Sequence, residues 1–256
     1  MTVLIISNCQ GNEILKYLNY CSVFQQTYNN QLVIMPHLYN LTSDLPQDII
    51  EFCKKADLFI YQPMSIRRGP FETETDNGII KYLKESCIKV SFPSLYADIF
   101  PIYFEDQWQG KKTIRKIKGV NHIKNLINDG YSKTDIINLY ERGDLYFELK
   151  ERFEYCMKFM EEKEKKCEIK ASQFIIDNIK NIRLFDTQNH PTEKLHGFIS
   201  NQILKYLNFN HEIDYLNLER FTINGDPGKF SFEDSIYMKK ELNFNYLSDF
   251  NETNYR

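Results

Sequence analysis

The chain has 256 residues, of which 42 % are hydrophobic and 14 % aromatic, so it can bury a sizeable core, and intrinsic disorder is excluded. Its formal net charge of −3 gives no general attraction to nucleic acid or to an anionic membrane, and we expect no nucleic-acid partner. No stretch approaches the roughly 18 to 20 apolar residues that span a bilayer, so we expect no transmembrane segment.

The first seven residues and the cysteines predict the compartment. The N-terminal apolar run carries no positively charged leader and is shorter than the core of a signal peptide. The six cysteines form no C-x-x-C pair and no cluster with zinc-ligand spacing. We therefore predict a cytoplasmic protein with reduced thiols that mostly serve as small buried side chains, and no metal site.

The first half of the chain alternates short apolar strands with helical segments. Strands are predicted at 2–7, 32–35, 58–61 and 88–92, and helices at 13–18, 46–55 and 77–85. Strands separated by helical segments of about 10 residues are typical of a parallel sheet with crossover helices. Because the strands are continuously apolar, we expect helices to cover both faces of the sheet.

The second half favours helices. They are predicted at 121–128, 134–140, 145–166 and 192–207, with a last strand at 182–185 that returns to the edge of the sheet. Ser132 and Asp135 have the spacing of a helix-start capping box. The predicted fold class is α/β, with a short parallel Rossmann-like sheet flanked by helices and a largely helical second half. We expect a single domain, with a sheet core at about 1–105 and 182–207, a helical insertion at about 118–181 and an irregular tail at 208–256.

The polar loop after the first strand is the first candidate site. The loop leads into the first helix, and a helix start offers unpaired backbone N–H groups that can bind a phosphate or a thiolate. Cys9 lies at this position, where the pKa of a thiol can be lowered. Asn8 and Asn12 can donate amide hydrogen bonds to an oxyanion, and Gly11 permits either a close backbone approach or a positive φ. The alternative is an ordinary turn, since Asn and Gly are standard turn residues.

A second candidate loop carries His190. Pro191 stiffens it, and Asp186 lies four positions upstream, so a rigid loop presents an imidazole with an acidic neighbour. That arrangement suits a general base whose ring is oriented by a carboxylate. The alternative is a simple helix entry with Thr192 as the cap. His196 is predicted to be structural, within the helix that follows.

Other polar residues follow the third and fourth strands. Gln62 should lie on the same rim of the sheet as Cys9, and Arg67 and Arg68 follow it in the next loop. Both this pair and the basic stretch at 111–118 could bind phosphates or could simply be solvated surface. Ser94 is an alternative nucleophile without a visible base. The charged run at 161–166 is predicted to be a solvated helix end.

Four motifs in this order resemble the WcbI-like family of polysaccharide-biosynthesis acetyltransferases. They are Asn-Cys-Gln-Gly after the first strand, Tyr-Gln-Pro after the third, Phe-Pro-Ser-Leu-Tyr after the fourth and the late Asn-His-Pro-Thr. The resemblance spans roughly residues 1 to 207. Ser7 stands where the family motif usually begins with glycine, which implies a slightly altered turn.

The resemblance implies coenzyme A or acetyl-CoA as a substrate and acetyl transfer to a sugar of a capsular or surface polysaccharide. The acceptor would be a sugar, a nucleotide-sugar or a glycan, and the enzyme would associate with other polysaccharide-biosynthesis proteins. It implies catalytic roles for Cys9, His190, Asp186 and Asn8. It implies coenzyme A binding by Gln10, Gly11, Asn12, Gln62, Arg67 and Arg68.

The chain is also similar to the Ser-Gly-Asn-His hydrolases (SGNH-like), with Cys9 in the place of the serine and Asp186 with His190 in the place of the late pair. The spacing of that pair is one residue longer than in the hydrolases. The expected mechanism uses His190 as base, with transfer either direct or through an acetyl group on Cys9. The alternatives are a carbohydrate esterase using Cys9 or an activated water, and a non-catalytic binding protein for a nucleotide or sugar.

Overall fold

The computed structural model describes residues 1–39, 44–101, 103–109, 112–118, 121–218 and 232–247. The chain divides into two compact units. Unit 1 comprises Met1–Leu95, Phe159–Phe174 and Pro191–Phe221, and unit 2 comprises Tyr96–Lys158, Ile175–His190 and Thr222–Arg256. The predicted α/β class is confirmed in unit 1, which contains the parallel sheet.

The sheet of unit 1 has the strand order β2-β1-β3-β4, and all its pairings are parallel. Its strands are β1 (Thr2–Ile6), β2 (Asn30–Ile34), β3 (Leu58–Tyr61) and β4 (Ile88–Ser91). In the register, Ile6 is level with Ile34 and Tyr61, and Tyr61 is level with Ser91. The four carboxyl ends therefore lie along one edge of the sheet, as the alternation of strands and helices predicts.

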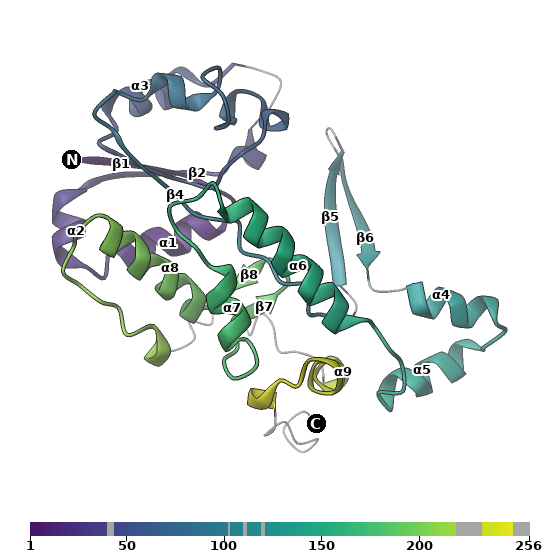
Figure 1. Ribbon diagram of the computed structural model, residues 1–256. Coiled ribbons are helices and arrows are strands. Elements are labelled where there is room, and N and C mark those ends of the chain that lie inside the picture. The colour runs from purple at the N-terminus through teal and green to yellow at the C-terminus, as the bar shows by residue number, and fades with distance from the viewer. Residues whose placement is uncertain (40–43, 102, 110–111, 119–120, 219–231, 248–256) are drawn as a thin grey trace. The chain divides into compact units, whose positions relative to one another are not determined.

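Helices cover both faces of this sheet (Figure 1). One face carries α3 (Gln47–Lys55), and the other carries α1 (Gln10–Leu18), α2 (Ser22–Thr27) and α8 (Glu193–Tyr206). All five residues of β1 are buried, because the strand is central and covered on both faces. His196 of α8 is buried beside Tyr17 of α1 with the rings stacked 6.4 Å apart, which agrees with its predicted structural role.

The helix predicted at 77–85 is wrong: only the 3₁₀ turn η3 (Ile79–Tyr82) forms there. The preceding loop takes the backbone hydrogen bonds, since the Glu72 carboxylate accepts from the amides of Glu74 and Thr75, and the Glu72 carbonyl accepts from Ile79. Gly78 lies against that carbonyl, and a Cβ at this position would come within 2.0 Å of its oxygen. Local side-chain capping therefore replaces the expected helical ladder.

Unit 2 begins with an antiparallel hairpin that the sequence did not predict, β5 (Tyr103–Gln109) with β6 (Lys112–Lys118). Helices follow as predicted: α4 (Asn121–Asn128), α5 (Lys133–Glu141) and α6 (Leu149–Glu164), whose last turns belong to unit 1. The Ser132–Asp135 capping box at the start of α5 is confirmed, with both reciprocal hydrogen bonds present. The shorter helix α7 (Ser172–Asn178) was not predicted.

The predicted return of a last strand to the sheet is wrong for the described residues. β7 (Phe185–Thr187) pairs instead with β8 (His190–Pro191) in a separate two-stranded ribbon. The turn between them is so short that the chain folds back on itself before it can reach another strand. The predicted irregular tail also contains a helix, α9 (Phe232–Leu242), followed by the 3₁₀ turn η5 (Asn245–Leu247).

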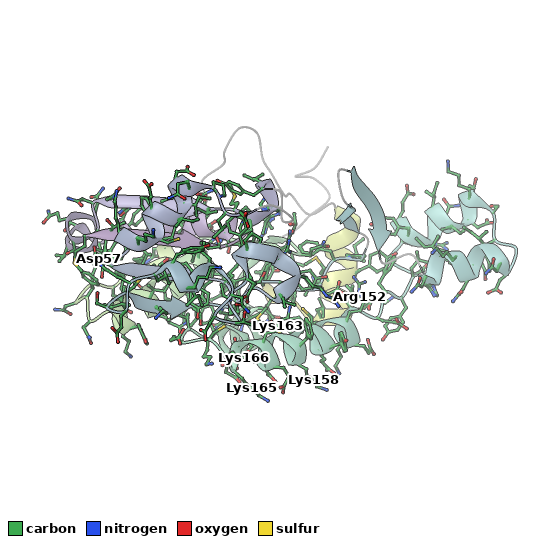
Figure 2. All side chains as sticks on the ribbon, turned by 90° about the horizontal axis from the view of Figure 1, so that it is seen from above. Asp57, Arg152, Lys158, Lys163, Lys165 and Lys166 are labelled. Atoms are coloured by element: carbon green, nitrogen blue, oxygen red, sulfur yellow. The ribbon has the colours of Figure 1, made fainter. Side chains whose placement is uncertain are left out.

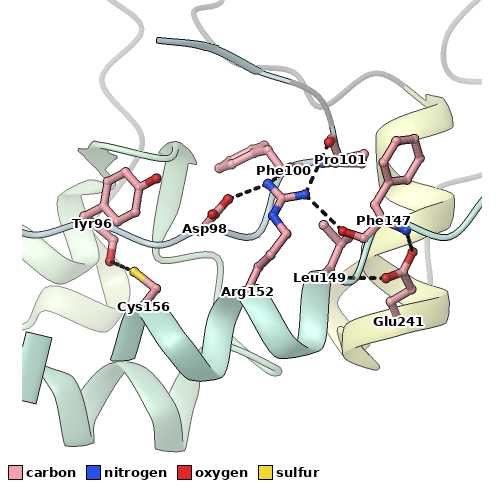
Figure 3. Close-up of polar contacts among 9 residues, drawn as sticks. All are labelled: Tyr96, Asp98, Phe100, Pro101, Phe147, Leu149, Arg152, Cys156 and Glu241. Atoms are coloured by element: carbon pink, nitrogen blue, oxygen red, sulfur yellow. Dashed lines mark hydrogen bonds and ion pairs between the residues drawn. The ribbon is translucent and has the colours of Figure 1, made fainter. Parts of the chain in front are cut away.

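The interior of unit 2 is organised around Arg152 of α6 (Figure 3). Its guanidinium pairs with Asp98 and donates to the carbonyl oxygens of Phe100 at 2.8 Å and Phe147 at 3.2 Å. Glu241 of α9 accepts hydrogen bonds from the amides of Phe147 and Leu149, at 2.9 and 2.8 Å. These contacts join the segment after β4, the start of α6 and the helix of the tail into one unit.

Candidate functional site

A cavity of about 560 Å³ opens at the carboxyl ends of the strands in unit 1. This is the edge where open parallel sheets bind ligands, and the volume falls within the usual range for small-molecule sites. Every strand of the sheet contributes lining residues from the loop that follows it, and the end of α6 closes one side. These residues include Ser7 and Asn8 after β1, His37 after β2, Gln62, Ser65 and Arg68 after β3, Ser94 after β4, and Lys163, Lys166 and Cys167 from the end of α6.

Asn8 is fixed at the start of α1. Its Oδ1 accepts a hydrogen bond from the amide of Gln10, the first residue of α1, at 3.0 Å, which closes a local side-chain turn. Its Nδ2 donates to Oγ of Ser94, after β4, at 3.4 Å. That bond is long, and both groups line the cavity, so the amide can turn to a carbonyl oxygen placed there.

Two buried glutamines lock the loops of three strands together. Gln62 accepts from the amide of Asn8 at 3.0 Å and donates to Oε1 of Gln10 at 2.8 Å. Gln10 in turn donates to the carbonyl of Leu95 at 2.8 Å and accepts from the Leu95 amide at 3.1 Å. The structure thus brings Gln10 and Gln62 together, with their amides turned to one another and to the backbone.

Gly11 lies in the first turn of α1 with a close backbone approach. A Cβ there would come within 2.0 Å of Oγ of Ser7, whose hydroxyl donates to the carbonyl of Asn8. Of the two reasons the sequence offers for this glycine, close approach is the one that the structure shows. Asn12 is exposed and makes a weak contact, 3.9 Å, to the sulfur of Met35.

Cys9 is the N-cap residue of α1 and the exposed member of the six cysteines, all of which are unpaired. Desolvation by the surrounding chain raises the pKa of its thiol, and Glu13 adds to the effect, while the backbone amides of Cys9 and Gln10 oppose it. The lowered pKa expected at a helix start is therefore wrong here, because partial desolvation of the sulfur by neighbouring groups outweighs the two amides.

Arg67 and Arg68 lie on the 3₁₀ segment η2 (Ile66–Phe71), and both are exposed. Arg68 lines the cavity; Arg67 is not among its lining residues in the part of the chain that the structure describes. The basic stretch at 111–118 begins at an undescribed residue and continues through strand β6, whose side chains also lie outside the described residues.

The late loop passes from unit 2 to unit 1, with His190 the last residue in unit 2 and Pro191 the first in unit 1. Nδ1 of His190 lies 2.6 Å from Oγ1 of Thr187, so the partner that the structure gives this imidazole is a hydroxyl. Asp186 makes an ion pair with Arg183 at 2.9 Å. Thr192 is the N-cap residue of α8, so the loop also serves as the helix entry that the sequence allows.

Comparison with known proteins decides the family. A family model described as polysaccharide biosynthesis enzyme WcbI matches residues 2–212. The chain belongs to the WcbI family. The resemblance carried by the four motifs is therefore confirmed, and the chain is an enzyme of polysaccharide biosynthesis. No curated protein sequence matches it.

A solved WcbI structure has the same fold. It superposes with a TM-score of 0.70 at 18 % sequence identity, over 98 % of this chain and 81 % of that one. That protein is described as a novel polysaccharide biosynthesis enzyme, in its native form without a disulfide bond between coenzyme A and one of its cysteines. Among the described residues of this WcbI family member, no helix is long and apolar enough to cross a membrane, and no His, Cys, Asp and Glu side chains gather as metal ligands.

Sequence analysis missed several residues that line the cavity of this WcbI family member. His37 follows β2 directly, at the same edge as Asn8, and that position was a usable signal. Lys163 and Lys166 belong to the charged run at 161–166, for which the sequence predicts a solvated helix end, and Cys167 follows this run. Nothing in their spacing shows which lysines of the run face a cavity.

The chemistry of Cys9 gives a direct test. We expect iodoacetamide to modify a single cysteine in the native protein, because Cys9 is exposed and the other five are buried. Its rate should rise with pH to a midpoint above the roughly 8.5 of a free thiol, since the raised pKa leaves little thiolate at neutral pH. Mass spectrometry of the native protein at a series of pH values measures both.

The control is Cys9→Ser, which should abolish the rapid modification and leave the buried thiols slow. A midpoint below that of free cysteine would show instead that the helix start activates Cys9 as a nucleophile.

Proposed function

We propose that this enzyme transfers an acetyl group from acetyl-CoA to a hydroxyl of a sugar in polysaccharide biosynthesis. The observation that carries the proposal is the cavity at the sheet edge, which the Asn8 amide and the Ser94 hydroxyl line together with the cationic side chains of Arg68, Lys163 and Lys166. Such donors suit a thioester carbonyl and the phosphates of coenzyme A, respectively. The family match and the coenzyme A reported for the solved relative support the same donor.

In the proposed reaction the sugar hydroxyl attacks the thioester carbonyl. A C–O bond forms and the C–S bond breaks, so the products are an acetylated sugar and free coenzyme A. A general base, the role that the sequence suggests for His190, takes the proton from the hydroxyl and returns it to the departing sulfur, which keeps the reaction balanced. Asn8 donates its side-chain amide to the oxyanion of the tetrahedral intermediate.

Direct transfer is the route that the state of Cys9 favours. A transient acetyl group on Cys9 requires a thiolate, and the pKa of this thiol is raised. Cys9 is not among the lining residues of the cavity in the described part of the chain, so the proposal gives it no covalent role in the transfer. The acceptor in this proposal is a sugar, a nucleotide-sugar or a glycan.

The first experiment is calorimetry of coenzyme A and acetyl-CoA with the wild type and with Cys9→Ala. We expect micromolar binding to both proteins, since direct transfer does not require the thiol for donor binding. No binding at millimolar ligand would reject the transferase. Release of acetate from a model ester without coenzyme A would assign the site to an esterase instead.

A further inference from the structure

The charged end of α6 forms one wall of the cavity. Lys163 and Lys166 line it from this helix end, and Arg68 lines it from the loop after β3. We propose that these three side chains form a binding site for the diphosphate group of a substrate, an inference that rests on the proposed function for the choice of ligand. Arginine and lysine are the side chains that bind phosphate oxygens most strongly.

The segment after α6 is clamped to the end of β4, which orders this wall before any ligand binds. The Glu168 carboxylate accepts from the amide and the hydroxyl of Ser91, at 2.6 and 2.5 Å. The amide of Ile169 donates to the Ser91 carbonyl at 3.0 Å, and the Ser91 hydroxyl approaches the carbonyl of Lys166 at 3.4 Å. Ser91 is fully buried, whereas Glu168 is exposed, so the clamp joins the interior of the sheet to the surface segment that follows α6.

The turn that ends α6 is also closed by a buried carboxylate. Glu164 accepts hydrogen bonds from the amides of Ala171 and Ser172, at 2.9 and 3.1 Å, and from the Ser172 hydroxyl. Lys170 donates to the carbonyl of Cys167 at 2.6 Å. Lys163 and Lys166 therefore extend from a backbone whose position is fixed on both sides.

The loop with Arg68 is closed at its base. Met64 donates its amide to the Thr73 hydroxyl at 2.8 Å, and Thr73 donates its amide to the Met64 carbonyl at 2.9 Å. The Arg68 amide donates to the carbonyl of Ser65 at 2.9 Å. A closed loop keeps the entropic cost of ordering the guanidinium low when it binds an anion.

In the part of the chain that the structure describes, the positive charges of Arg68, Lys163 and Lys166 are not neutralised by ion pairs. Within the described residues, no carboxylate forms an ion pair with Arg68, Lys163 or Lys166. The nearby Glu162 pairs with Lys165 at 2.6 Å, which reduces its repulsion of an anion. Figure 2 shows Lys163, Lys165 and Lys166 gathered at the end of α6, and of these Lys165 does not line the cavity in the described part of the chain.

Both substrates of the proposed reaction can contain the diphosphate group that this wall is proposed to bind. Coenzyme A contains a diphosphate, and so does a nucleotide-sugar acceptor. Arg68, Lys163 and Lys166 line the cavity together with two carboxylates, Glu74 and Glu162, so the cationic side chains outnumber the anionic ones and favour an anionic group over a neutral sugar. The wall therefore selects a substrate with a diphosphate.

The test is calorimetry of inorganic pyrophosphate with the wild type, Lys163→Ala, Lys166→Ala and Arg68→Ala. Each variant should weaken pyrophosphate binding about five- to tenfold, and added salt should weaken wild-type binding. Lys158→Ala is the matched control, an exposed lysine of the same helix that does not line the cavity among the described residues, and it should bind like the wild type. Equal affinity in all four variants, or no pyrophosphate binding by the wild type, would overturn the proposal.

Parallel titrations separate the two sources of the diphosphate and the two proposals. If the lysine variants bind acetyl-CoA more weakly than the wild type does but bind pantetheine equally well, the wall binds the diphosphate of the donor. If the lysine variants instead lose affinity for a uridine diphosphate sugar and keep their affinity for acetyl-CoA, the wall binds the diphosphate of the acceptor. If the substitutions weaken the binding of pyrophosphate and of the nucleotide-sugar but acetyl-CoA does not bind even the wild type, the diphosphate site is supported and the proposed acetyltransferase activity is rejected.

Discussion

His190→Asn is expected to lower the rate of acetyl transfer about 100- to 10,000-fold, the usual contribution of a general base. Acetyl-CoA affinity should be unchanged, because the proposed role of the imidazole is to move a proton. Thr187→Val should cause a smaller loss, since Thr187 contacts Nδ1 at 2.6 Å and orients the ring without accepting the substrate proton. Steady-state kinetics with acetyl-CoA and a sugar acceptor measures both variants.

Substitutions at two further histidines serve as a control and as a test of the alternative base. His211→Asn removes an exposed imidazole that does not line the cavity among the described residues, and it should leave the rate unchanged. His37→Asn removes the imidazole that does line the cavity. If His37→Asn abolishes transfer and His190→Asn does not, the base is His37 and the assignment of His190 is wrong.

The sheet could be predicted because its signals are local. Each strand is a short apolar run, and the helices between them show a spacing of apolar residues that identifies one buried face. The carboxyl edge follows from parallel pairing alone, so Asn8, Gln62 and Ser94 could be expected at one rim. What Gln62 does there could not be predicted, because its partner Gln10 lies 52 residues away.

The missed features have signals that are weak or shared with ordinary surface. Strands β5 and β6 carry charged and amide residues at most positions, so no apolar run marks them. Lys163 and Lys166 look like any solvated lysines until the Ser91–Glu168 clamp brings their segment to the end of β4. Helix α9 has only a weak pattern of apolar residues, and its contacts with the segment before α6 form over more than 90 residues of sequence.

Gln62→Ala is expected to lower the free energy of unfolding by about 2 to 4 kcal/mol. The change leaves the Asn8 amide without its acceptor, removes a donor to Gln10 and opens a cavity beneath the loop, since Gln62 is 4 % exposed. Gln62→Met keeps most of the volume without the hydrogen bonds, so the difference between the two variants separates the cavity from the lost network. Chemical denaturation of all variants measures the free energy.

The matched control is Gln47→Ala, which removes an exposed amide on α3 and should change stability by less than about 0.5 kcal/mol. Because Gln62 fixes the backbone of Asn8, Gln62→Met should also slow acetyl transfer more than it weakens acetyl-CoA binding. A folded Gln62→Met enzyme with unchanged kcat would show that Asn8 needs no such support. Equal denaturation midpoints for Gln62→Ala and Gln47→Ala would show that the amide network contributes nothing to the stability of unit 1.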